Sequence, residues 1–278
     1  MVNVTRFSGG NPSVQPEEAD TFTAGIVVQP RFLPGFSASV DWYQIEINGA
    51  IGQLGAQAVV NRCEEGATEL CALVTRDPTT DRLVLVGDVF VNVDRNTVSG
   101  IDFEANYRSA LDLFGGAQES ISARLFASWL DENSEALAGA ATIDRAGQTG
   151  IQQSDGIAYS LPEWKATGNL TYQNGGFSAF LQGRYIGDGT LQNTLVEGVN
   201  IESNHVDSAF YADLALSYRW GLGAGAELEL FGQVTNLFDE DPPITPYYSA
   251  FLGYSQQYNP SLFDVLGRRY TLGFRLTR

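Results

Sequence analysis

Residues 209–220 read Ala-Phe-Tyr-Ala-Asp-Leu-Ala-Leu-Ser-Tyr-Arg-Trp, and this stretch decides the fold. Its even positions are apolar or aromatic from Phe210 to Trp220, whereas its odd positions include Asp213 and Arg219. Side chains alternate between the two faces of a β-strand. The stretch therefore predicts a strand with one apolar face and one polar face.

The same period of two recurs along the chain. It is clear at 163–173, where Trp164 to Tyr172 alternate with polar residues such as Lys165, and again at 119–129. Nine strands are predicted in all, and they lie at 19–30, 36–47, 101–108, 119–129, 163–173, 177–187, 209–220, 226–237 and 265–278.

The connections between these strands alternate in length. The short ones carry Gly, Pro or Asn, as tight turns require, and lie at 31–35, 110–117, 174–176 and 221–225. The long ones lie near 48–98, 130–162, 188–208 and 238–264. A transmembrane barrel has short turns on one side and long loops on the other, whereas a β-sandwich has no reason to alternate.

Strand length agrees with a membrane barrel. Ten residue steps from Phe210 to Trp220 span about 33 Å, and a tilt of about 40° projects them onto roughly 25 Å, the height of an outer-membrane apolar band. Aromatic residues also stand near the ends of the apolar rows, as interfacial girdles do. We therefore expect an all-β, antiparallel transmembrane β-barrel. The alternatives are a soluble secreted β-sandwich that binds carbohydrate and a small porin-like barrel.

Composition excludes several function classes. The 278 residues carry a formal net charge of -17, so the chain is a poor binder of nucleic acid, whose phosphates demand cations. Charged residues make up 18%, below the roughly 25% of an ordinary soluble domain. No apolar run reaches about 18 residues, which excludes a transmembrane helix.

Nine strands do not close an antiparallel barrel. The first strand precedes a short turn and the last follows a long loop, so both run in the same direction and cannot pair antiparallel. Open edges would expose unpaired backbone groups to lipid. The N-terminal residues also lack the apolar stretch of a signal peptide. We therefore expect residues 1–278 to be the C-terminal part of a longer barrel, with 1–18 as the rest of an extracellular loop.

Three motifs carry a resemblance to a known family. They are Asn-Pro-Ser-Val-Gln-Pro-Glu at 11–17, Val-Thr-Asn-Leu-Phe-Asp at 234–239, and Gly-Arg-Arg-Tyr-Thr-Leu-Gly-Phe-Arg at 267–275. Their order and spacing resemble the C-terminal barrel region of a TonB-dependent outer-membrane receptor. One departure is Arg278, since members of this family tend to end in an aromatic residue that the assembly machinery reads.

The resemblance implies a twenty-two-stranded barrel of which this chain supplies the last nine strands, in the outer membrane of a Gram-negative bacterium. It further implies uptake of a scarce ligand (a siderophore, cobalamin, haem or an oligosaccharide) through the outer loops. The implied partners are lipid, the N-terminal barrel and plug domain, and the TonB complex, which pulls on an N-terminal box. Nothing in it implies an enzyme, a cofactor or a metal site.

Two sets of residues are candidates for the transport pathway. Charged side chains on the polar rows are expected to line the lumen and meet the plug, unless they are simply a solvated wall. The principal ones are Glu104, Arg108, Arg124, Lys165, Arg184, Arg219, Glu229 and Arg269; Asp102, Asp213, Glu227 and Arg275 share the rows. Loop aromatics offer large contact area at low entropic cost. Those expected to contact the ligand, unless they pack loop to loop, are Tyr247, Tyr248, Phe251, Tyr254 and Tyr258.

Other reactive residues suggest no catalysis. Cys63 and Cys71 are expected to form one local disulfide, the alternative being two free thiols in a loop. The carboxylates of Glu64, Glu65 and Glu69, and those at 239–241, lack calcium-loop spacing and are expected to be solvated. His205 near Ser203, Asp207 and Ser208 would matter only in an outer-membrane hydrolase, and proximity in sequence does not make a triad.

Overall fold

The computed structural model describes residues 4–64, 66–92, 95–114, 118–136, 142–150, 160–223, 225–249 and 254–278. The chain forms two compact units. The first consists of Met1–Phe22, Gln44–Ser99 and Glu132–Asp144, and the second of Thr23–Tyr43, Gly100–Asp131 and Arg145–Arg278.

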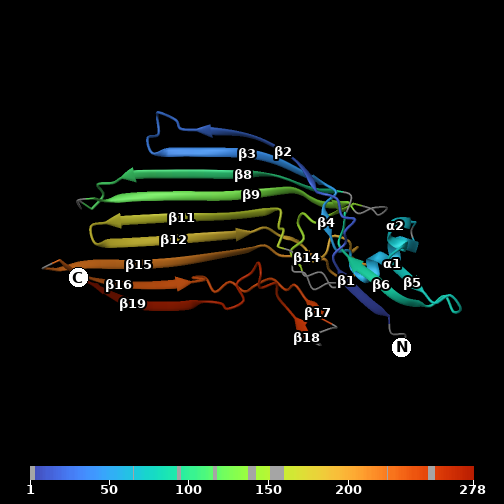
Figure 1. Ribbon diagram of the computed structural model, residues 1–278. Helices are drawn as coiled ribbons and strands as arrows, with labels where there is room; N and C mark the ends of the chain where they lie inside the picture. Colours follow the sequence, from blue (N-terminus) through green and yellow to red (C-terminus); the bar gives the residue numbers. More distant parts are fainter. Residues whose placement is uncertain are drawn as a thin grey trace. The chain divides into compact units, whose positions relative to one another are not determined.

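Among the described residues, nine long strands follow one another in a single sheet, in the order β19-β16-β15-β12-β11-β9-β8-β3-β2, and the short β10 pairs with β9 beside this path (Figure 1). Their bounds are β2 (Glu18–Val28), β3 (Phe36–Asn48), β8 (Arg95–Ala110), β9 (Ser120–Ala136), β11 (Trp164–Asn174), β12 (Phe177–Ile186), β15 (Ala209–Gly223), β16 (Ala226–Thr235) and β19 (Arg269–Thr277). Neighbours from β9 to β19 pair antiparallel. The predicted fold class is confirmed. Among the described residues β2 and β19 do not pair, so the barrel is not closed.

Strand register sorts side chains onto two faces. Leu181 lies opposite Leu170 on one side and Leu214 on the other, so apolar residues of successive strands form one continuous surface. We call this surface the apolar face. Its exposed large side chains are Leu125, Trp164, Leu170, Leu181, Tyr185, Phe210, Leu216, Tyr218, Trp220, Leu230, Tyr270, Leu272, Phe274 and Leu276. Exposed apolar surfaces of this extent mark a contact with a partner or a membrane.

Aromatic pairs stand near both ends of the apolar face. Towards the long loops, Trp164 stacks on Phe103 and on Trp129, with ring centroids 6.2 and 6.3 Å apart. Towards the short turns, the rings of Tyr218 and Trp220 lie 4.4 Å apart. Amphipathic rings prefer the two interfaces of a bilayer to its centre.

The short connections predicted from the sequence are present, at 29–35, 111–119, 175–176 and 224–225. The turn before β3 requires a glycine. Gly35 has a φ of 82°, and a Cβ there would lie 2.0 Å from the carbonyl oxygen of Arg108. Only a residue without a side chain fits this conformation and this close approach.

The long connection between β3 and β8 is a folded module rather than an irregular loop. It contains α1 (Ala56–Glu64), α2 (Thr68–Cys71) and the short strands β4 (Ile51–Gly52), β5 (Val74–Arg76), β6 (Leu83–Val89) and β7 (Val91–Asn92). β1 (Thr5–Gly9) joins it in a three-stranded sheet of order β1-β6-β5. Its buried core is Val59, Ala67, Leu70 and Val86. The sequence analysis predicted only a loop here.

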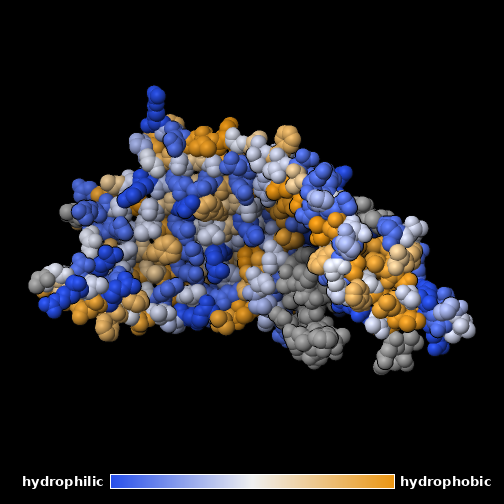
Figure 2. All heavy atoms as spheres, viewed as in Figure 1, coloured by the Kyte–Doolittle hydropathy of each residue, from blue (hydrophilic) through white to orange (hydrophobic). Residues whose placement is uncertain are grey.

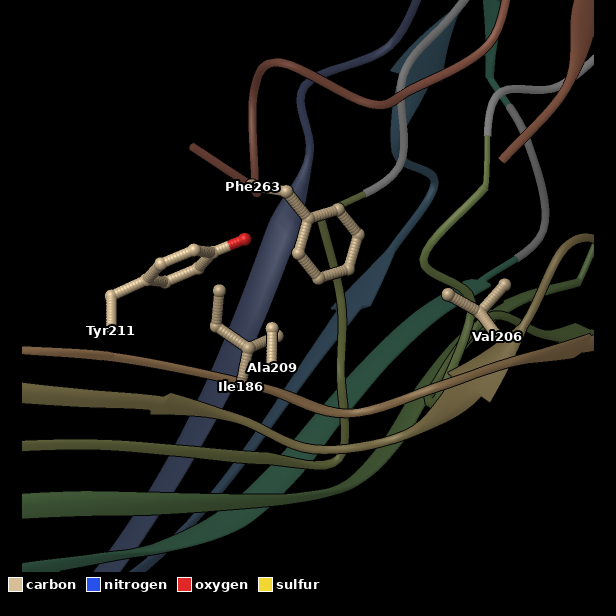
Figure 3. Packing of buried hydrophobic residues seen from close by; sticks show 5 residues of the cluster. All are labelled: Ile186, Val206, Ala209, Tyr211 and Phe263. Carbon is tan, nitrogen blue, oxygen red and sulfur yellow. The ribbon is translucent and has the colours of Figure 1, made fainter. Parts of the chain in front are cut away.

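The remaining long connections contain a second small core, in the second unit. Ile186, Val206, Ala209, Tyr211 and Phe263 are all buried, and Figure 3 shows the rings of Tyr211 and Phe263 beside Ile186 and Ala209. The short strands of these connections are β10 (Ile143–Asp144), β13 (Gly189–Thr190), β14 (His205–Val206), β17 (Tyr247–Ser249) and β18 (Tyr254–Gln256).

Polar residues reach the molecular surface over the strands. Figure 2 presents one face, on which hydrophilic residues are spread among apolar ones across the strands. Among the described residues, no helix has the length and apolar character needed to cross a membrane.

Gly100 tests how tightly the wall strands approach one another. A Cβ at Gly100 would lie 2.4 Å from the carbonyl oxygen of Trp129 and 2.7 Å from the hydroxyl of Tyr43. We expect Gly100→Ala to lower the free energy of unfolding by about 1–3 kcal/mol, because backbone must move. Denaturant unfolding followed by tryptophan fluorescence measures this.

Gly168 is the matched control, since the nearest atom to its Cβ position is the Leu125 side chain at 3.9 Å. Gly168→Ala should leave stability unchanged or slightly raised. Equal losses in the two variants would show that strand spacing is not what selects glycine at position 100.

Candidate functional site: the inner face and its loops

The face opposite the apolar face, called here the inner face, gathers the predicted charged rows. Register places Lys165 opposite Ser128, Gln182 opposite Asp213, and Arg219 opposite Glu229. Neighbouring polar groups also bond across strands, as the Gln182 side chain donates to Asn169 Oδ1 at 2.9 Å. The strand period alone therefore brings the polar rows together on one surface.

Ion pairs between arginine and glutamate cross the strands of the inner face. Arg124 Nη2 lies 3.0 Å from Glu104 Oε1, and Glu229 contacts both Arg219 at 3.5 Å and Arg275 at 3.1 Å. The arginines are more than half exposed, so each pair contributes at most about 1 kcal/mol to stability. Their larger effect is to fix the positions of charges along the wall.

A hollow of about 450 Å³ lies on the inner face near the level of Trp164. Its polar lining includes Asp41, Asp102 and Lys165, and Phe126 offers an aromatic surface beside them. The full lining is Ser39, Asp41, Asp102, Phe103, Glu104, Phe126, Ala127, Ser128, Lys165, Ala166 and Thr167. This volume lies within the range of small-molecule sites, and convergent polar groups on an apolar floor are typical of them.

The other predicted lumen residues also lie along this face. The Arg184 guanidinium sits over the Tyr211 ring, 5.3 Å from its centroid. Arg269 pairs with Asp264 at 3.3 Å, and Arg108 is exposed. A lumen-lining role for these residues stays a prediction, because no lumen is enclosed by the described strands.

The predicted aromatic ligand contacts are only partly described. Tyr247, Tyr248 and Tyr254 lie in β17 and β18, which pair with each other, and Tyr258 is half-buried. Phe251 lies outside the described residues. Ligand contact at these residues therefore also stays a prediction.

A buried polar layer joins three of the long connections, and the sequence analysis missed it. Asn259 Nδ2 donates to the carbonyl oxygen of Thr149 at 2.8 Å, and Asn193 Nδ2 donates to Ala146 at 2.7 Å. Gln148, which is fully buried, accepts from the Asn193 backbone N–H at 3.2 Å. Nothing in the local sequence signals that such distant segments share hydrogen bonds.

The motif at 234–239 closes the base of the last long connection. Asn236 is fully buried with a φ of 52°, and its side chain both donates to and accepts from the backbone of Glu240. Asp239 accepts from the Arg268 backbone N–H at 2.9 Å and pairs with the Arg268 guanidinium at 3.1 Å. The two ends of the connection are thereby fastened where β16 and β19 meet.

The structure also shows the contacts of the cysteines, loop carboxylates and histidine that the sequence singled out. Cys63 and Cys71 are joined by a disulfide, with Cα atoms 4.8 Å apart. Glu64 pairs with Arg76 at 2.7 Å, and Glu65 lies outside the described residues. His205 contacts Asp207 at 3.2 Å, and both side chains are largely exposed, unlike a shielded catalytic pair.

In the described ranges, no group of three or more His, Cys, Asp or Glu side chains is placed to hold a metal ion.

One sheet with an apolar face, two aromatic belts and a charged inner face defines the wall of a membrane β-barrel. The family model "TonB dependent receptor-like, beta-barrel" matches residues 2–237. The chain belongs to this family of outer-membrane receptor barrels.

Solved structures of similar fold include two receptors and an iron transporter. A mutant of the ferric enterobactin receptor PfeA from Pseudomonas aeruginosa is 15% identical with a TM-score of 0.56, and the match covers 94% of this chain and 31% of that one. The FrpB iron transporter from Neisseria meningitidis is 16% identical with a TM-score of 0.53, covering 98% and 31%.

The siderophore receptor PirA from Acinetobacter baumannii is 14% identical with a TM-score of 0.52, covering 96% of this chain and 32% of that one. The chain thus spans about a third of the length of the receptors that it matches. No curated protein sequence matches it.

Leu181 tests which face meets lipid. It lies mid-strand on the apolar face, whereas its neighbour Gln182 lies on the inner face. We expect Leu181→Arg to lower the free energy of unfolding in bilayers by about 2–4 kcal/mol, because a cation there enters hydrocarbon. Gln182→Arg should cost little. The reverse ranking, measured by denaturant titration in phospholipid vesicles, would invert the assignment of the faces.

Asp239 tests the closure of the last long connection. Asp239→Ala removes the acceptor of both Arg268 contacts, and we expect faster amide hydrogen exchange at 267–270. Asp239→Asn keeps an acceptor and tolerates the positive φ of 59°, so its exchange should stay close to that of the parent chain. If amide hydrogen exchange at 267–270 were unchanged in the Asp239→Ala variant, the contacts between Asp239 and Arg268 would not be what fastens this connection.

Proposed function

We propose that this chain is the C-terminal wall of an outer-membrane receptor that takes up a scarce ligand with energy from the TonB complex. Ferric siderophores are the first ligand class to test. Cobalamin, haem and oligosaccharides are the others. The proposal includes the long connections near 48–98, 130–162, 188–208 and 238–264 as extracellular loops, and the short turns as periplasmic.

The separation of the two faces is the observation that carries the proposal. The apolar face exposes residues such as Leu181 and Phe274, which lipid would cover, while the inner face holds the cross-strand ion pairs. Charges within a membrane span face a bundle interior or a water-filled passage. A wall of this kind suits a passage for a polar ligand.

The loops support recognition rather than catalysis. The folded module at 49–92 and the buried polar layer around Gln148 hold loop segments in fixed positions, which lowers the entropic cost of binding a ligand. The similar structures are those of two receptors and a transporter. The disulfide in the module is in keeping with an oxidising compartment outside the cytoplasm.

The arrangement of the sheet and its inner face also supports a set of proposed partners. Among the described residues, β2 and β19 each have one edge with no strand beside it. Such edges need neighbouring strands in a bilayer, and we propose that further strands of the same receptor supply them. The inner face would then meet a plug domain, and the plug would contact the TonB complex. The hollow lined by Asp41, Asp102 and Lys165 is the part of the wall proposed to meet the plug or the passing ligand.

Uptake by the native bacterium tests the proposal. Deleting the coding region for this chain should reduce accumulation of ⁵⁵Fe supplied as a ferric siderophore such as ferric enterobactin. A protonophore, which removes the energy that TonB uses, should reduce uptake in the parent strain to the same level. Complementation with the parent gene is the control.

Parallel assays with labelled cobalamin, haem and oligosaccharide identify the ligand class. Loss confined to one of them would replace the siderophore in the proposal. Unchanged uptake of all four classes would contradict the proposed function.

A further inference from the structure

Two neighbouring short turns expose apolar side chains at their tips. Phe32 in the turn between β2 and β3 is 87% exposed. Leu113 and Phe114, in the turn between β8 and β9, are 69% and 77% exposed. Exposed apolar side chains that gather at one end of a molecule can mark a contact with a partner or a membrane.

The two turns lie at the same end of the sheet because β3 and β8 are neighbouring strands. The Arg108 backbone N–H donates to the carbonyl oxygen of Gly35 at 2.9 Å, which fastens the end of one turn to the end of β8. Both turns belong to the second compact unit. Both tips thus lie at the short-turn end of the sheet, and Phe32, Leu113 and Phe114 are together called the patch here.

A buried carboxylate holds the second turn on the side of the apolar face. Glu119 is 2% exposed, and its Oε1 accepts from the Tyr172 hydroxyl at 2.6 Å. Its Oε2 accepts from the backbone N–H groups of Leu113 at 2.7 Å and Phe114 at 3.2 Å. Tyr172 lies opposite Ile121, in the apolar row that begins with Trp164. The clamp thus places Leu113 and Phe114 beside the aromatic belt at the short-turn end.

Electrostatics keep the clamp in place at neutral pH. The hydroxyl of Tyr172 and the two backbone donors hold the pKa of the Glu119 carboxyl below its ordinary value of 4.5. The carboxyl is therefore an anion at neutral pH, and it accepts hydrogen bonds from all three donors. A buried carboxylate with good hydrogen bonds is a strong constraint on the turn that supplies them.

The first turn adds a cation to the patch. Arg31 is exposed and directly precedes Phe32, so a guanidinium stands next to an exposed aromatic ring. Aromatic and aliphatic side chains with an adjacent basic residue favour the headgroup region of a membrane, where the ring is buried and the cation meets phosphate.

We propose that the turn at 29–35 and the segment 111–114 after β8 anchor the wall by inserting Phe32, Leu113 and Phe114 into the headgroup region of the phospholipid leaflet at the short-turn end. Leu113 and Phe114 continue the apolar face through Glu119 and Tyr172, which is the argument for lipid as the occupant. A periplasmic protein is the competing occupant. This inference rests on the proposed membrane placement of the chain and adds an anchoring site to it.

Spin labels on single cysteines test the anchor. Both native cysteines are disulfide-bonded, so an introduced cysteine is the free thiol for labelling. The variants Phe32→Cys and Phe114→Cys are made in the full chain, reconstituted in vesicles of phosphatidylethanolamine and phosphatidylglycerol. Leu181→Cys on the apolar face and Asp77→Cys in the folded module are the lipid and water controls.

The readout is relaxation of the label by oxygen, which enters lipid, and by a water-soluble nickel chelate. We expect both turn labels to lie between the two controls, with several-fold less nickel accessibility than Asp77→Cys. The anchor alone would be overturned if the turn labels were as accessible to nickel as the Asp77→Cys label while the Leu181→Cys label remained in lipid. Protection of the turns only after adding periplasmic extract would also overturn it, in favour of a protein partner.

A different result is expected if the proposed membrane placement of the chain itself is wrong. If the Leu181→Cys label is itself accessible to nickel, the apolar face is not in lipid, and the anchor and the membrane placement are both overturned. These outcomes are therefore distinguishable in one experiment.

The Glu119 clamp gives a second, independent variant. Adding Glu119→Ala to Phe114→Cys should raise the mobility and the nickel accessibility of the label, because the turn loses its acceptor. The same substitution added to Phe32→Cys should change neither, since that turn is not bound by Glu119. If the mobility and the nickel accessibility of the Phe114→Cys label did not change, Glu119 would not be what holds this turn in place.

Discussion

The requirement that every strand satisfy its backbone through its neighbours is the constraint on which this structure depends. Within a bilayer there is no water to bond to unpaired N–H and C=O groups, so a spanning strand must be hydrogen-bonded along its length. From β9 to β19 the register runs without a break except at the bulge between Gly221 and Gly223. With the backbone satisfied in this way, side chains alone distinguish the two faces.

Side-chain chemistry then assigns each face to a different environment. The apolar face presents large exposed side chains between two aromatic belts, whereas the inner face carries ion pairs such as Glu104–Arg124 and a polar hollow beside Lys165. The motif residues Asn236 and Asp239 fasten a long connection at the rim, and Glu119 fastens a short turn at the other end. The strands thus separate the two environments, and the side chains at their ends hold the connections in place.

Local periodicity predicted the strands of the wall because the alternation of apolar and polar residues within each strand determines its two faces. All nine strands and the short turns follow from that pattern, and so does the polar row from Glu104 to Arg275. The helical module at 49–92 could not be predicted in this way, since Val59 and Val86 form a core through contacts between segments. The same holds for the Asn259–Thr149 bond and the Glu119 clamp, which depend on tertiary placement.

The four tryptophans offer the most direct measurement of the central claim, that the apolar face of this wall contacts lipid. Trp42, Trp129, Trp164 and Trp220 are the only tryptophans in the sequence, and all lie on apolar rows. The account predicts that phospholipids brominated on their acyl chains strongly quench the native fluorescence of the reconstituted chain. It also predicts stronger quenching by bromine near the headgroup than by bromine near the bilayer centre. Fluorescence unaffected by brominated lipid but quenched by aqueous iodide would contradict it.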